Sequence, residues 1–467
     1  MGNRDEQTAL GALTALAGKI QMLTQECLSK AGSEARMVRV WKKRVSEFEY
    51  GPQGVNNLRW SFEDTEKVTL DHLFAPIYEA VEASEDYAGA RDACKTISKR
   101  GWDLSNGFRH FAYALIALCV GKTTDLGRRV DKLIHTYVKE LRGEALAYEA
   151  EIRLVGIVVE PESVDFVLDD LSLRLRQVKA SDFEEEIDAE SAQLRGVLDM
   201  GTPMFVTPHA ILNLAGRAVD SNEIRMEGWK SIAILDLFRI GSVKRTLFRV
   251  DFEGFNDLGA MGVEFGHDQF PGPEKYVVKI DDAERLRTFW TAVSPVVPEH
   301  FYWAPSGTTY TPQGIAFVRY SDALENGQSE KRIANAVMGL ESLLLGGAGE
   351  HSELSYRLGM RAAKLLGFCG CNPTRIRDVL RDAYGVRSTF VHGDKLGNRQ
   401  KRKLQTKYGS EADLIREVLN YLRRAIVLSL LMNVEKKDLI AQLDSALVDP
   451  SMDRSLEKEV RKYGGLL

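Results

Sequence analysis

The stretch TRIRDVLRDAYGVRSTFVHG, residues 374–393, decides what the sequence predicts for the C-terminal third of the chain. Its apolar residues recur at spacings of three and four, which is typical of a helix with one buried face. Asn372 and Pro373 precede it, as is typical of a helix start, and Gly393 follows it. A glycine directly after a helix is typical of a left-handed C-cap. The sequence therefore predicts a helix that ends at His392.

Four further segments between residues 309 and 467 show the same helical spacing. They are IAFVRYSDALEN (315–326), EKRIANAVMGLESLLLG (330–346), ELSYRLGMRAAKLLGF (353–368) and SEADLIREVLNYLRRAIVLSLLMNV (410–434). The connections between them are short, and short connections place consecutive helices antiparallel. We expect residues 309–467 to form an α-helical bundle of about five helices.

The rest of the chain differs in pattern from this bundle. Residues 1–148 show mostly helical spacing, which predicts an N-terminal helical domain of unknown role. Residues 149–308 contain strand-like alternation, with Leu171, Leu173 and Leu175 on one face, which predicts a β-rich or α+β domain. The Pro-, Gly- and Thr-rich segment 304–314 is the best candidate for a linker. The expected fold class is multidomain α+β.

The composition of the chain is that of an ordinary soluble globular protein. Its 467 residues have a net charge of −5, so a nucleic-acid partner would have to bind a local basic patch. The five cysteines are few and scattered, and they predict neither a disulfide framework nor a zinc site. The longest apolar runs are too short to span a bilayer, so we expect a cytoplasmic protein with no metal and no other cofactor.

Arg387 and His392 are the candidates for chemistry. An Arg that precedes a His at this distance is a loose pattern, and Arg128 and Arg129 precede His135 in the same way on a helix with a charged face. Side chains five positions apart on one helix point about 140° from each other. A joint site therefore requires that the chain turns at His392, or that the partner side chain comes from another copy.

The surroundings of this pair favour a site. Phe390 and Val391 would anchor the last helical turn in the bundle, whereas Arg387, Ser388 and His392 would face a cleft. Residues 394–407 follow with six cations and one acid, Asp394, a net charge of +5 that predicts a phosphate-binding loop. The six predicted RNA-binding residues are Lys395, Arg399, Lys401, Arg402, Lys403 and Lys407.

Three sequence pieces in this region resemble the HEPN superfamily, in particular the Apea-like HEPN domains of bacterial defence proteins. They are ANAVMGLESLLLGG with Glu341, SYRLGMRAAKLLG with Arg357 and Arg361, and AYGVRSTFVHG with Tyr384, Arg387 and His392. The last piece is similar to the family's R-x4-6-H motif in its R-x4-H form. Residues 149–308 loosely resemble the β-rich segment that often precedes such a domain. Many active members have Asn, Asp or His after the Arg, and here that position is Ser388, which can still donate and accept a hydrogen bond.

The resemblance implies a metal-independent endoribonuclease, with Arg387, His392 and Ser388 in the active site and Glu341 and Tyr384 in support. It also implies RNA as substrate, a homodimer or higher homo-oligomer, and a role in anti-phage or toxin-type defence. One His cannot easily be the acid and the base of the same step, and a symmetric dimer would supply two.

Two functional alternatives remain open at this point, beside a plain helical bundle in which His392 caps a helix and takes part in no chemistry. The first is a non-catalytic HEPN domain that dimerises and binds RNA, with the Arg and the His as structural groups. The second is a sensor protein in which residues 1–308 bind a protein or nucleotide trigger and restrain the nuclease. The second alternative is compatible with ribonuclease activity, because a toxic nuclease needs a restraint.

Overall fold

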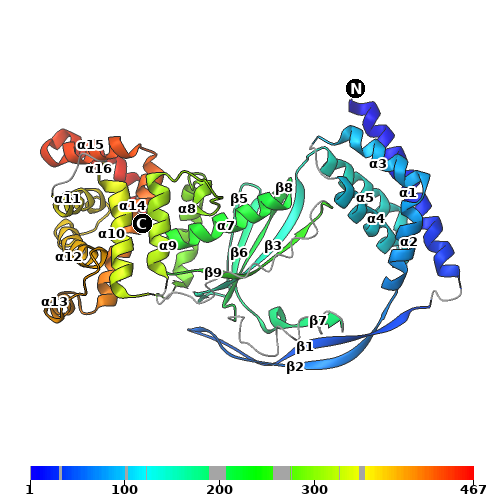
Figure 1. Cartoon of the computed structure of the whole chain (residues 1–467), viewed down its shortest axis with the longest axis horizontal. Helices are drawn as coiled ribbons and strands as arrows, with labels where there is room; N and C mark the ends of the chain where they lie inside the picture. Colours follow the sequence, from blue (N-terminus) through cyan, green and yellow to red (C-terminus); the bar gives the residue numbers. More distant parts are fainter. Residues whose placement is uncertain are drawn as a thin grey trace. The chain divides into compact units, whose positions relative to one another are not determined.

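The computed structural model describes residues 2–30, 34–99, 104–121, 124–188, 207–255, 274, 276–325, 327–346 and 353–467. The chain contains both helices and strands, and its C-terminal region is helical (Figure 1). Contacts between residues divide it into two compact units. Unit 1 comprises residues 1–153, 165–225 and 246–265, and unit 2 comprises residues 154–164, 226–245 and 266–467. The chain passes between the units several times, whereas the sequence predicted three consecutive domains.

A helical cluster forms one part of unit 1. Its elements are α1 Gly2–Ser29, η1 Asp71–Leu73, α2 Phe74–Glu82, α3 Glu85–Ile97, α4 Leu104–Val120 and α5 Leu126–Leu141. Aromatic side chains fill its core, where Phe111 stacks on Tyr137 with 4.6 Å between ring centroids. Phe255 meets both rings edge-on, at 5.5 and 5.6 Å. The helices expected in this part of the chain are therefore confirmed.

Residues 36–69 contradict the expectation of a helical domain over 1–148. They form β1 Arg36–Gly51 and β2 Gly54–Thr69, a long antiparallel ribbon (Figure 1). Val38 and Val40 alternate with polar residues in β1, and such alternation of β-branched side chains favours a strand. Gly54 closes the turn with φ +90°, a backbone conformation that glycine adopts without a steric cost. These signals were present in the sequence, and the helical spacing on either side obscured them.

The strands predicted over residues 149–308 are confirmed. A five-stranded sheet has the order β5-β6-β8-β3-β9. In it Leu173 pairs with Leu214 and Leu175 with Leu212, and all four side chains are buried. The elements are β3 Leu146–Val155, β5 Ser163–Leu168, β6 Leu171–Gln177, η2 Ala180–Phe183, β8 Ala210–Ala218, α7 Ser221–Phe238 and β9 Lys244–Phe252.

Two smaller sheets complete the described strands. β7 Glu185–Asp188 pairs with β1 in an antiparallel manner. In unit 2, β4 Ile157–Val159 and β10 Tyr276–Val278 form a parallel pair. This pair joins the segment between β3 and β5 to a segment that follows β9, the last strand of the five-stranded sheet in the chain.

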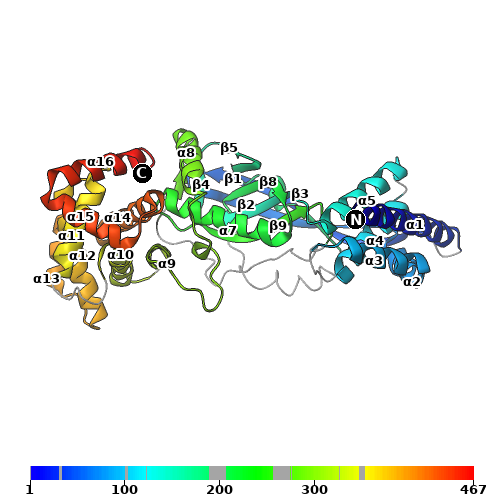
Figure 2. The ribbon, with the colours of Figure 1, turned by 90° about the horizontal axis from the view of Figure 1, so that it is seen from above.

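Helices make up most of unit 2, and Figures 1 and 2 show α9–α16 gathered together. The elements are η3 Ile280–Asp282, α8 Ala283–Val293, η4 Glu299–Phe301, α9 Pro312–Leu324, α10 Ser329–Leu344, α11 Leu354–Gly367, α12 Pro373–Val391, α13 Asn398–Tyr408, α14 Glu411–Met432, α15 Lys436–Val448 and α16 Pro450–Gly464. The expected helical region is confirmed, although the described part holds eight helices after residue 311 instead of about five. The predicted linker lies inside unit 2, and its last residues already belong to α9.

The longest apolar runs of the sequence lie in α4 and α14, and most of their side chains are buried. Phe111, Leu115 and Ile116 of α4 are fully buried, as are Ile426 and Val427 of α14. In the described part of the chain, no helix is long and apolar enough to cross a membrane.

Buried arginines close the C-terminal ends of helices in unit 2. The last carbonyl groups of a helix have no partner within it and carry partial negative charge. Arg332 donates from Nε to the Ala323 carbonyl at the end of α9, over 2.7 Å. Arg361 donates from Nη1 to the Leu344 carbonyl at the end of α10, over 2.9 Å. In both cases a buried guanidinium donates to a carbonyl group at a helix end, and the partial negative charge there partly compensates the charge of the arginine.

Arg423 on α14 is also buried and closes a third helix end. Its Nη1 donates to the carbonyls of Leu237 and Phe238 at the end of α7, over 2.8 and 3.0 Å. Its Nη2 donates to Asn420 over 3.1 Å. Burial lowers the pKa of Arg423 to about 10, so the side chain remains charged at neutral pH. The end of α7 is thereby joined to the long central helix of the unit.

We expect Arg423→Ala to lower the free energy of unfolding by about 3 kcal/mol or more, because two buried carbonyls lose their donor. Urea unfolding followed by circular dichroism measures this change. The control is Arg461→Ala, which removes an exposed ion pair with Glu457 on α16 and should change stability by about 0.5 kcal/mol or less. Equal effects of the two substitutions would show that the buried contact is not important for stability.

Candidate active site

Helix α12 forms as its sequence predicts. The Asn372 side chain accepts a hydrogen bond from the Arg375 amide over 3.0 Å, and Pro373 is the first helical residue. The face that packs into the unit is fully apolar, with the buried residues Ile376, Val379, Leu380, Ala383 and Val386. The cap and this apolar face fix which side of α12 is left for solvent.

The end of α12 is a left-handed glycine cap. His392 is the C-cap residue, and Gly393 has φ +79°. The Gly393 amide donates to the Phe390 carbonyl and the Asp394 amide donates to the Thr389 carbonyl, both over 3.0 Å. This pair of bonds is the Schellman motif. The predicted helix end at His392 is confirmed.

Arg387 lies in a small polar cluster with Glu341 and Tyr384. Its Nη2 donates to Glu341 Oε2 on α10 over 3.1 Å, and the two side chains are only 24% and 16% exposed. The guanidinium carbon lies 5.5 Å from the centroid of the Tyr384 ring. Burial raises the pKa of the Glu341 carboxyl, and the charge of Arg387 opposes this rise. The structure thus brings together three residues that the family resemblance singled out.

His392 is exposed at the surface, and it hydrogen-bonds to no other side chain in the described part of the chain. No hydrogen bond or ring contact joins the described side chains of Arg387 and His392. Helix α12 extends to Val391, and ideal helical spacing of about 100° per residue directs the two side chains about 140° apart. Ser388 is half-buried and lies on the His392 side of α12. The chain does not turn so as to bring Arg387 and His392 together within one copy.

The residues next to His392 depart from the prediction in one respect. Phe390 is half-buried, in keeping with an anchoring role. Val391 is 50% exposed and cannot anchor the last turn as predicted. The apolar contacts of this turn come instead from Val386, one turn earlier, which is fully buried. The end of α12 is therefore held by its glycine cap and by the packing of the preceding turn.

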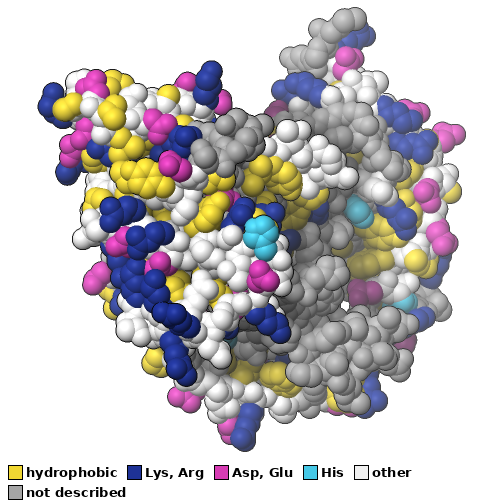
Figure 3. All heavy atoms as spheres, turned by 60° about the vertical axis from the view of Figure 1, so that its left-hand side comes forward, with side chains coloured by type: hydrophobic (Ala, Val, Ile, Leu, Met, Phe, Trp, Pro, Cys, Tyr) yellow, Lys and Arg dark blue, Asp and Glu magenta, His cyan; other side chains and the backbone are white. Residues whose placement is uncertain are grey.

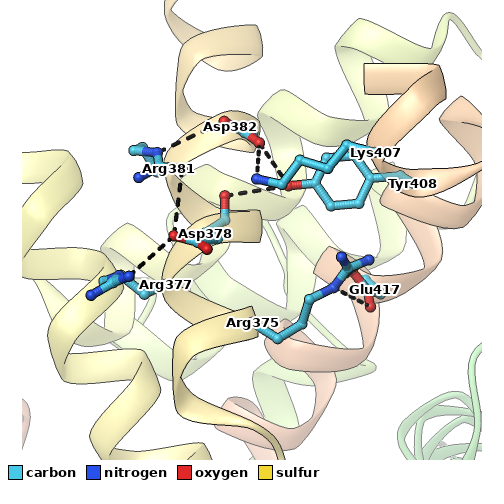
Figure 4. Close-up of polar contacts among 8 residues, drawn as sticks. All are labelled: Arg375, Arg377, Asp378, Arg381, Asp382, Lys407, Tyr408 and Glu417. Atoms are coloured by element: carbon cyan, nitrogen blue, oxygen red, sulfur yellow. Dashed lines mark hydrogen bonds and ion pairs between the residues drawn. The ribbon is translucent and has the colours of Figure 1, made fainter. Parts of the chain in front are cut away.

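The basic stretch is a helix, and the prediction of a phosphate-binding loop over 394–407 is wrong in this respect. Residues 398–408 form α13, with Leu404 and Tyr408 buried. Two of the six predicted cations are engaged within the chain: Lys401 pairs with Glu330 over 3.0 Å, and Lys407 with Asp382 over 2.6 Å (Figure 4). The remaining four cations are exposed and have no ionic partner among the described residues; they are Lys395, Arg399, Arg402 and Lys403.

Lys and Arg side chains also gather on the surface of the C-terminal helices, as Figure 3 shows. Two exposed arginines of α12, Arg377 and Arg381, were missed by the sequence analysis. Both pair with Asp378 over 3.4 Å (Figure 4). The two arginines are four residues apart in the sequence. Ser388 and His392 follow at intervals of seven and four residues, which puts all four residues on one helix face.

Arg361, one of the family-matching residues, is a structural side chain here. It is buried, caps α10, and pairs with Asp444 over 2.7 Å. Among the described residues, no group of three or more His, Cys, Asp and Glu side chains is arranged to hold a metal ion. Comparisons with family models, with curated proteins and with solved structures gave no match.

We expect Gly393→Ala to lower the free energy of unfolding by about 1 kcal/mol, since a side chain at positive φ is strained. Thermal unfolding measures the change, and hydrogen exchange at the Asp394 amide should report a loosened helix end. The control is Gly464→Ala at the end of α16, where an added Cβ meets open space and φ is not positive. That control should be neutral or slightly stabilising. If both variants kept wild-type stability, the cap would have no role in holding the site.

Proposed function

We propose that the protein is a metal-independent endoribonuclease of the HEPN type, with Arg387 and His392 as its catalytic residues. The observation that supports this most is the exposed imidazole at the capped end of α12, close in sequence to a half-buried arginine. It is followed by cations on α13 that have no ionic partner among the described residues. The resemblance to the HEPN superfamily implies an active-site role for the same two residues. Ser388, on the His392 side of the helix, would hold the substrate by hydrogen bonds.

RNA contains its own nucleophile, so the chemistry needs only proton transfer and charge stabilisation. One imidazole removes the proton of a 2′-OH, and the resulting oxygen attacks the adjacent phosphorus. The bond from phosphorus to the 5′ oxygen breaks, and a second, protonated imidazole gives its proton to that oxygen. Arg387 donates to the phosphate oxygens while negative charge builds up on them. The products are a 2′,3′-cyclic phosphate and a 5′-OH.

The divergence of Arg387 and His392 on α12 favours a site shared between two copies. In a symmetric dimer each copy contributes one imidazole and one guanidinium. The two imidazoles then serve as base and acid, which a single His cannot do in one step. Arg387 keeps Nη1 for this role, because Glu341 engages Nη2 and the Nε atom is buried.

The remaining regions fit a restrained defence nuclease. In this proposal residues 309–467 form the HEPN bundle, and residues 1–308 bind a protein or nucleotide trigger in the cytoplasm of a bacterium. The long β1–β2 ribbon gives the N-terminal region a surface on which a trigger could bind. Restraint is needed because free cleavage of cellular RNA would kill the cell.

A non-catalytic module that dimerises and binds RNA is the second candidate. The ion pair between Arg387 and Glu341 favours it, since a half-buried and paired arginine is typical of a structural role. In that case the unpaired cations of α13 would bind RNA without turnover.

We expect His392→Ala to reduce the cleavage of single-stranded RNA by about 10² to 10⁴-fold, because proton transfer is lost. Purified protein and total bacterial RNA are incubated with EDTA, and the fragments are analysed for 2′,3′-cyclic phosphate ends. The matched control is His135→Ala, which changes an exposed histidine of α5 that also follows arginines. This control should cleave as the wild type does.

Wild-type cleavage by the His392 variant would refute the assignment. If neither the wild type nor the variants cleave RNA, but all bind it in a salt-dependent manner, the non-catalytic module is supported instead.

A further inference from the structure

The solvent face of α12 holds more than the end residue His392. With about 100° between successive residues, Arg377, Arg381, Ser388 and His392 lie within about 60° of one another around the helix. These four residues form a stripe along the helix, which we call the α12 stripe, and the buried side of the helix lies away from it. The α12 stripe extends about 22 Å along the helix axis, at 1.5 Å per residue. Two guanidinium groups therefore precede the candidate catalytic imidazole on one continuous face.

Asp378 orients both arginines of this stripe. Its carboxylate pairs with Arg377 and with Arg381 over 3.4 Å each, while the two guanidiniums remain 46% and 61% exposed (Figure 4). Arg381 also pairs with Asp382 over 3.8 Å, and Lys407 pairs with the same carboxylate. The three bases and two acids of this cluster together have a net charge of +1. The arginines are thus held in position and can still bind an anion.

Helix α13 lies alongside α12 and adds to the same surface. Lys407 pairs with Asp382, and the Tyr408 hydroxyl donates to that carboxylate over 2.7 Å and to the Asp378 carbonyl over 3.3 Å (Figure 4). At the other end of α13, a Cβ on Gly385 would lie 3.9 Å from Nε2 of Gln400. The start of α13 is therefore near residue 385 and its end near residue 378, so the two helices run antiparallel.

The orientation of α13 places its free cations next to the stripe. Leu404 and Tyr408 face the unit, and Lys407 and Gln400 face α12. By helical geometry Arg399 and Lys403 lie next to that flank on the solvent side. The α12 stripe and these two residues form one basic surface, which we call the α12–α13 track: Arg377, Arg381, Ser388, His392, Arg399 and Lys403.

We propose that the α12–α13 track binds the phosphate backbone of a single-stranded RNA and leads it to His392. The proposal rests on the proposed nuclease function and deepens it, because it assigns the contacts that hold the substrate beyond the cleaved bond. Arginine forks suit phosphate oxygens, and a line of separated cations suits an extended polyanion. A single strand is required because its backbone can rotate the 2′-OH in line with the leaving oxygen, whereas a rigid A-form helix cannot.

The test measures RNA binding by the full chain in the His392→Ala background, so that the RNA stays intact. The probe is a fluorescein-labelled oligouridylate of about 12 nucleotides, and anisotropy is followed at several salt concentrations. Adding Arg377→Ala and Arg381→Ala should weaken binding about tenfold at low salt. The slope of log K against log salt should become shallower by about 1.4, because two phosphate contacts are lost at about 0.7 each.

The matched control carries Arg454→Ala and Lys458→Ala, which remove the same charge from exposed positions of α16 in the same unit. It should bind as the parent does. If the two double variants lost RNA affinity equally, net charge alone would explain the effect, and the proposed RNA-binding role of the α12–α13 track would be overturned. The proposal would also be overturned if the parent did not bind RNA. Equal competition by a polyglutamate peptide of similar charge would overturn it as well, because it would indicate an acidic protein partner.

The outcome also separates the track from the nuclease. If RNA binding depends on Arg377 and Arg381 and wild-type protein does not cleave RNA, the track stands and the proposed activity fails. If wild-type protein cleaves RNA and the double variant binds as tightly as its parent, the track alone fails.

Discussion

The helical unit depends on buried guanidinium groups that satisfy the C-terminal ends of helices. Arg423 joins α14 to the end of α7 through two carbonyls, and Arg361 closes α10 through the Leu344 carbonyl. A helix end that is buried without a donor leaves unpaired carbonyls and uncompensated partial charge. Arginine meets both needs, since it supplies several donors and a positive charge from one planar group. These contacts fix where the helices end relative to one another, which apolar packing alone does not specify.

The candidate site follows from this arrangement. Because α10 is fixed at its end by Arg361, Glu341 on α10 is held opposite Arg387 on α12. The ion pair and the Tyr384 ring then keep the Arg387 guanidinium in place, partly removed from water, where its attraction for a phosphate is stronger. At the end of the same helix the Gly393 cap stops the chain so that His392 projects into solvent. One rigid helix therefore carries an ordered cation and a free imidazole on different sides.

Local signals in the sequence predicted the elements that local interactions form. The cap residues Asn372 and Gly393 and the apolar spacing of α12 were sufficient for that helix, and alternation was sufficient for β6. The β1–β2 ribbon was not predicted, because strong helical patterns flank its long strands in the sequence. The basic stretch was predicted to be a loop, because the charge of α13 hides the helical spacing of Leu404 and Tyr408. No pattern in the sequence shows that Glu330 and Asp382 engage Lys401 and Lys407, since these ion pairs form between separate helices.

In the proposed mechanism, two copies share one site that needs both imidazoles. Wild-type and His392→Ala proteins are mixed at constant total concentration, allowed to exchange subunits, and assayed for RNA cleavage against the wild-type fraction. If each active assembly needs both imidazoles, activity follows the square of that fraction, and an equal mixture retains about one quarter of full activity. A linear dependence, with about one half of the activity in the equal mixture, would contradict the account, because each copy would then cleave RNA with its own His392 alone.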